Sequence, residues 1–122
     1  MKNLTREWVQ KAEGDAHTAG REYRARIHHN PDALCFHAQQ CAEKYFKAWL
    51  SEHGIRFGKT HDLEELLALC LPIRPNWELL RDALVLLNQY AVEFRYPGEC
   101  ATRAESREAY LASTLKCNKL TS

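Results

Sequence analysis

The clearest pattern of hydrophobic and polar positions runs from Asp32 to Gly54. A proline at the first turn, no internal glycine and the closing Gly54 are typical of one helix of about six turns. On a helix that advances about 100° per residue, more than half of the circumference is apolar. These apolar positions are Leu34, Cys35, Ala38, Cys41, Ala42, Tyr45, Phe46, Trp49 and Leu50. The remaining narrow strip is polar and consists of Gln40, Glu43, Lys44, Lys47 and Ser51. We therefore expect a helix that is buried on two or three sides and whose polar strip faces a groove, a partner or water.

Four further segments are predicted to form helices around this one. Apolar residues recur at intervals of three and four in Leu4–His28 and in Trp77–Phe94, which is the spacing of amphipathic helices. A shorter helix, Asp62–Leu71, is predicted between a capping Thr60 and a helix-breaking proline. A last and less apolar helix is expected at Thr102–Lys116.

Short loops join these helices, and no stretch shows the alternation that is typical of a strand. The chain is therefore predicted to be all-α, an up-and-down antiparallel bundle of four to five helices that forms one domain over residues 1–122.

Two polar residues fall on apolar helix faces. Asp15 is expected to need a neighbouring cation, and Gln39 is expected to need hydrogen bonds to a neighbouring helix or backbone.

Charge and cysteine usage narrow the class of protein further. Lysine and arginine total 17 against 16 aspartates and glutamates, so any polyanion would have to be bound by a local cluster of cations. The five cysteines are scattered without a C-x-x-C pair, which favours reduced core cysteines and predicts no metal site and no cofactor. No apolar signal sequence or membrane-spanning segment is present, so a cytoplasmic location away from membranes is expected.

Three short motifs follow one another along the chain. They are CFHAQQCAEK at Cys35–Lys44, KTHDL at Lys59–Leu63 and FRYP at Phe94–Pro97. Together, over the stretch from about Trp8 to Tyr110, they resemble the HEPN domain family of prokaryotes and eukaryotes. The resemblance implies a helical bundle that is usually a homodimer and is often encoded beside, or fused to, a minimal nucleotidyltransferase. Such pairs look like toxin–antitoxin modules, and many family members are ribonucleases that need no metal.

One family feature is missing from this chain. The ribonuclease members carry an arginine, four to six variable residues and then a histidine late in the domain. In the late region this chain has Arg95 and Arg103, but its last histidine is His61. No later residue can supply an imidazole as general acid or base. We therefore predict no catalytic residue.

The residues expected to contact a ligand lie in these motifs or, for Lys47, in the polar strip just after the first motif. They are Gln40, Glu43, Lys44, Lys47, His61, Arg95 and Tyr96. Two lysines and a glutamine one turn apart can hold a phosphate, while the glutamate pairs with a lysine or accepts from a base. The alternative is a solvated helix face with an ordinary Glu43–Lys47 ion pair. His61 either contacts an anion or packs against the long helix. Arg95 either binds phosphate in a dimer groove or pairs with Asp15 or Glu43.

The leading hypothesis is a non-catalytic, homodimeric, nucleotide- or RNA-binding protein that partners a nucleotidyltransferase in a two-component, toxin–antitoxin-like module. One alternative is a metal-independent endoribonuclease toxin that uses Arg95 with His37 or His61. Another is a docking module that only dimerises and binds a partner protein.

Overall fold

The computed structural model describes the backbone of residues 1–92 and 96–121 and the side chains of residues 1–92 and 96–114. In this part of the chain all regular structure is helical, which confirms the all-α class and the helical bundle. The elements are α1 (Asn3–Arg24), α2 (Pro31–Glu52), α3 (Leu63–Cys70), the 3-10 helix η1 (Pro75–Leu80), α4 (Arg81–Asn88) and α5 (Arg103–Thr121). None of these helices is long and apolar enough to cross a membrane.

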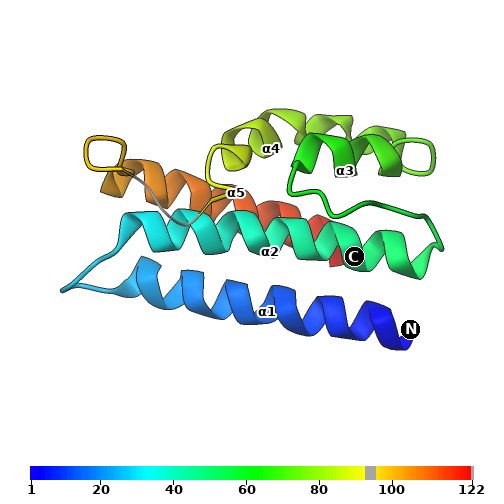
Figure 1. Ribbon diagram of the computed structural model, residues 1–122, viewed down its shortest axis with the longest axis horizontal. Coiled ribbons are helices and arrows are strands. Elements are labelled where there is room, and N and C mark those ends of the chain that lie inside the picture. Colours follow the sequence, from blue (N-terminus) through cyan, green and yellow to red (C-terminus); the bar gives the residue numbers. More distant parts are fainter. Residues whose placement is uncertain (93–95, 122) are drawn as a thin grey trace.

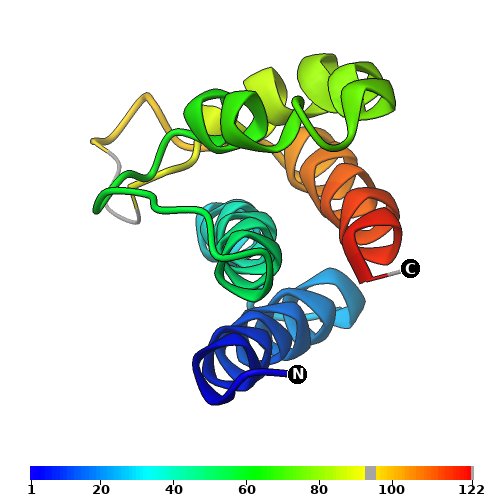
Figure 2. The same ribbon diagram turned by 90° about the vertical axis from the view of Figure 1, so that its right-hand side faces the viewer.

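Helix α2 lies at the centre of the fold and contacts α1, α3, α4 and α5 (Figures 1 and 2). Helix α1 runs antiparallel to α2 along one side, and α3 with α4 covers the opposite side. Between α2 and α3, residues 53–62 carry the chain back along α2 (Figure 1). As a result α2, α3 and α5 run in one direction, and α1 and α4 run in the other.

The start and end of α2 agree with the sequence prediction. The side chain of Asn30 accepts a hydrogen bond from the N–H of Ala33 at 3.1 Å, and Pro31 occupies the first turn, where its missing N–H is not needed. At the other end Gly54 has φ +66°, a conformation that glycine adopts without strain.

The core surrounds the apolar side of α2, as the pattern predicted. Phe46 is fully buried, and its ring contacts Trp77 at a centroid distance of 6.3 Å, while Trp49 contacts the same ring at 5.0 Å. Leucines from α3, η1 and α4 complete this cluster: Leu63, Leu66, Leu67, Leu80, Leu84 and Leu87. Burial of this apolar surface is the main force that holds α3 and α4 on α2.

The predicted helix over Trp77–Phe94 is wrong in its extent. Its first part is the 3-10 helix η1, and α4 ends at Asn88 because the N–H groups of Gln89 and Tyr90 bond to carbonyls three residues back. The Asn88 side chain also accepts from the N–H of Leu63 at 2.8 Å, which fixes this end of α4 at the start of α3. A spacing of three and four residues does not separate one long helix from such shorter turns. Phe94 lies outside the described residues.

Boundaries of α1, α3 and α5 also differ from the sequence prediction. Helix α1 ends at Arg24 and not at His28, because Ala25 is extended and its N–H bonds to the carbonyl of Glu22 at 3.2 Å. The cap of α3 is Asp62, whose carboxylate accepts from the N–H of Glu64 at 2.9 Å. Helix α5 continues past Lys116 to Thr121.

Cysteine placement follows the prediction in part. Cys35, Cys41 and Cys70 are buried and form no disulfide, and burial raises the pKa of the Cys70 thiol to about 12. Cys100 is exposed, so the prediction of a core cysteine is wrong there. The side chain of Cys117 lies outside the described residues.

Candidate functional site

A cavity of about 600 Å³ lies where α1, the polar strip of α2 and the 53–62 connection meet. It gathers the sequence-predicted residues Gln40, Glu43, Lys44, Lys47 and His61. The other lining residues are Trp8, Lys11, Phe57, Gly58 and Lys59. The polar strip therefore faces a cavity, which is one of the environments that the sequence suggested.

Glu43 lies at the centre of the polar contacts around this cavity. Its side chain is 3 % exposed and contacts the Nζ of Lys47 at 3.1 Å and the Nδ1 of His61 at 3.0 Å. The Lys47 ammonium also lies 5.4 Å from the ring centroid of Trp8 and 5.9 Å from that of Phe57. The expected Glu43–Lys47 ion pair is thus present, but it is buried and not part of a solvated helix face.

Lys44 is fixed by a carboxylate from α1. Its Nζ lies 2.5 Å from Oδ2 of Asp15, and the other oxygen of Asp15 lies 2.7 Å from Nδ1 of His37. The prediction that a buried Asp15 needs a cation is confirmed. This contact joins α1 to α2 directly beside the cavity.

Two consecutive hydrogen bonds between side-chain amides and the backbone orient the Gln40 side chain beside the cavity. Gln39 is fully buried, and its amide donates to the carbonyl of His61 at 3.0 Å, which confirms the predicted bond to backbone. Since the Gln39 amide nitrogen is the donor, its Oε1 is the acceptor for the amide of Gln40 at 2.8 Å. The amide nitrogen of Gln40 is therefore engaged by Gln39, and among the described residues no donor bonds to its Oε1.

Two lysines of this cavity were missed by the sequence analysis. Lys11 comes from α1 and Lys59 from the 53–62 connection, and both side chains are exposed. Among the described residues neither of them makes an ion pair. Lys59 belongs to the KTHDL motif, which is the signal that could have drawn attention to it. Lys11 has no such signal, because only the packing of α1 on α2 brings it to the strip.

The two remaining predicted residues do not join this group. Tyr96 is 65 % exposed and does not line the cavity. Arg95 lies outside the described residues. The imidazole of His61 is 66 % exposed, and its Nδ1 contacts Glu43, which agrees with the interpretation that His61 packs against α2. Contact of His61 with a ligand anion stays a prediction.

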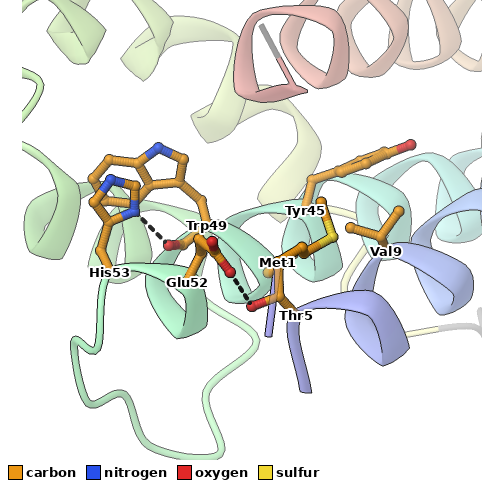
Figure 3. A pocket seen from close by; sticks show the side chains of 8 residues that line it. Met1, Thr5, Val9, Tyr45, Trp49, Glu52 and His53 are labelled. Carbon is orange, nitrogen blue, oxygen red and sulfur yellow. Dashed lines mark hydrogen bonds between the residues drawn. The ribbon is translucent and has the colours of Figure 1, made fainter. Parts of the chain in front are cut away.

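A second, smaller pocket lies between the start of α1 and the end of α2, with the stacked rings of Trp49 and His53 at one end (Figure 3). Its volume is about 200 Å³. Its carboxylate, Glu52, accepts from the backbone N–H of Lys2 and the hydroxyl of Thr5, both at 3.0 Å, and these bonds lower the Glu52 pKa. The lining contains no lysine or arginine among the described residues, so this pocket does not suit a phosphate.

Two comparisons relate this chain to known proteins. The HEPN domain family profile matches residues 5–114, and the chain belongs to this family. The fold is similar to the crystal structure of TT1696 from Thermus thermophilus, with a TM-score of 0.77 and 27 % identity over 98 % of each chain. No curated protein sequence matches the chain. Membership of the HEPN family supports a role connected with nucleotides or RNA in general terms.

Proposed function

We propose that this HEPN domain is a non-catalytic binding module that holds the phosphate of a nucleotide or an RNA in the cavity beside α2. The observation that carries the proposal is the convergence of Lys11, Lys44, Lys47 and Lys59 on one cavity. They come from α1, α2 and the 53–62 connection. Asp15 pairs with Lys44 and Glu43 pairs with Lys47, so in the described residues the four lysines leave an excess of positive charge at the cavity, which attracts an anion.

Other features of the cavity favour a nucleotide over a small inorganic anion. A volume of about 600 Å³ is in the range of pockets that hold small organic ligands. Trp8 and Phe57 contribute aromatic surface, with ring centroids 6.1 Å apart. Aromatic rings beside cations are typical of surfaces on which nucleic-acid bases stack.

Mutation of Lys11 and Lys59, the two cavity lysines that make no ion pair among the described residues, tests whether their charge binds the phosphate. Replacing Lys11 and Lys59 together by glutamine is expected to weaken binding of a labelled oligoribonucleotide at least tenfold, since each lost charged hydrogen bond is worth about 1.5–3 kcal/mol. Lys44 and Lys47 are less suitable, because their removal leaves Asp15 and Glu43 without these cations. Fluorescence anisotropy at fixed salt measures the affinity.

Arg26→Gln is the matched control, because Arg26 is exposed in the connection after α1, away from the cavity lining. It removes one positive charge from outside the cavity and should leave the affinity within about twofold. A loss of binding free energy per removed charge that is the same in the control and in the double variant would show nonspecific attraction and would remove the proposed site.

The assembly of the protein is a further part of the proposal. We propose a cytoplasmic homodimer that partners a nucleotidyltransferase in a toxin–antitoxin-like module, on the basis of family membership. Size-exclusion chromatography of the chain alone, and of the chain with a nucleotidyltransferase encoded next to it, tests both interactions. A monomer that elutes separately from that enzyme would contradict them.

A metal-independent endoribonuclease is a second candidate, and one contact favours it. A carboxylate only accepts hydrogen bonds, so Nδ1 of His61 carries the hydrogen directed at Glu43, which leaves Nε2 able to accept a proton. RNA cleavage in EDTA that disappears in His61→Ala would favour this candidate. Absence of cleavage by the native protein would favour the binding module.

A further inference from the structure

We infer that the cavity selects a terminal phosphate, a phosphate monoester that carries two negative charges, over an internal phosphodiester that carries one. This inference rests on the proposed function, because it concerns the ligand of the same cavity. Its basis is the difference between the lysines that already have carboxylate partners and those that do not.

Two of the four lysines are neutralised within the protein. Lys44 pairs with Asp15 at 2.5 Å, and Lys47 pairs with Glu43 at 3.1 Å. Both carboxylates are buried, so water screens these pairs weakly. The two pairs therefore add little net charge to the cavity.

The other two lysines leave the cavity with an excess of positive charge. Among the described residues, Lys11 and Lys59 make no ion pair, and they reach the cavity from separate segments of the chain. These two ammonium groups are therefore the lysine charge that a ligand has to balance.

A phosphate monoester matches this excess. Its second pKa is about 6, so at neutral pH it carries a charge close to −2 and presents three terminal oxygens. An internal phosphodiester carries one negative charge and two terminal oxygens, and it can neutralise only one of the two lysines. The second ammonium group would lose part of its hydration without gaining an anionic partner, which costs binding free energy.

Isothermal titration with three adenine ligands tests the inference. Adenosine 5′-monophosphate carries the monoester, 3′,5′-cyclic adenosine monophosphate carries the diester, and adenosine carries neither. We expect the 5′-monophosphate to bind about tenfold or more tightly than the cyclic diester. Lys11→Gln and Lys59→Gln should each reduce that preference to about threefold or less, whereas Arg26→Gln should leave it unchanged.

The outcomes separate the inference from the proposed function. Equal affinity for the monophosphate and the cyclic diester would overturn the inference and leave a phosphate-binding cavity. Absence of binding by all three ligands and by RNA would overturn both. Oligoribonucleotides of one sequence with a 5′-phosphate or a 5′-hydroxyl show whether the terminal phosphate belongs to an RNA end or to a free nucleotide. Tighter binding of the phosphorylated strand supports an RNA end, and a preference seen only with the mononucleotide supports a free nucleotide.

Discussion

Replacing Glu43 by alanine is expected to lower the free energy of unfolding by about 3–5 kcal/mol, which is the usual cost of leaving one member of a buried ion pair alone. The side chain of Lys47 is 6 % exposed and has Glu43 as its anionic partner at 3.1 Å. The variant would also lose one of the contacts that hold His61 and the 53–62 connection on α2, the other being the bond from Gln39 to the carbonyl of His61. Urea unfolding followed by circular dichroism measures the change.

A double variant separates the ion pair from simple loss of packing. Glu43→Leu with Lys47→Met removes both charges and keeps apolar volume, so it should recover most of the stability lost in Glu43→Ala. A loss below about 1 kcal/mol in Glu43→Ala would show that Lys47 reaches water readily. That result would contradict the burial of the Glu43–Lys47 ion pair beside the cavity.

Leu84→Ala is expected to cost about 2–5 kcal/mol, because Leu84 is fully buried where α4 packs on the core. The neighbouring residue on the same helix provides the control. Val85 is 45 % exposed, and Val85→Ala should change the stability by less than about 1 kcal/mol. Similar losses of unfolding free energy in the two variants would mean that Leu84 does not pack α4 against the core. The same urea titration compares them.

Much of the fold could be predicted from the sequence, because α2 carries several independent signals. Its proline, its closing glycine and its apolar arc all mark one helix, and the structure places that helix at Pro31–Glu52. The helix over Trp77–Phe94 had periodicity alone as its support. Its real boundaries depend on contacts between distant segments, such as the bond from Leu63 to Asn88.

The candidate site could be predicted only in part for a similar reason. Helical spacing groups Gln40, Glu43, Lys44 and Lys47 because they share one face of α2. It does not show that the 53–62 connection folds back over that face and buries Glu43 and Lys47. Nor does it show that Lys11 reaches the strip from another helix. These relations arise from packing between segments that are remote in the sequence.

Nuclear magnetic resonance can locate the phosphate that we propose to bind between α1, α2 and the 53–62 connection. Adding adenosine 5′-monophosphate to ¹⁵N-labelled protein should shift the backbone amide signals of Lys11, Gln40 and Lys59. The backbone amide signals of Arg26 and of the residues around Trp49 should not shift. Shifts confined to the pocket of Trp49 and His53, or no shifts at saturating nucleotide, would contradict phosphate binding at the cavity beside α2.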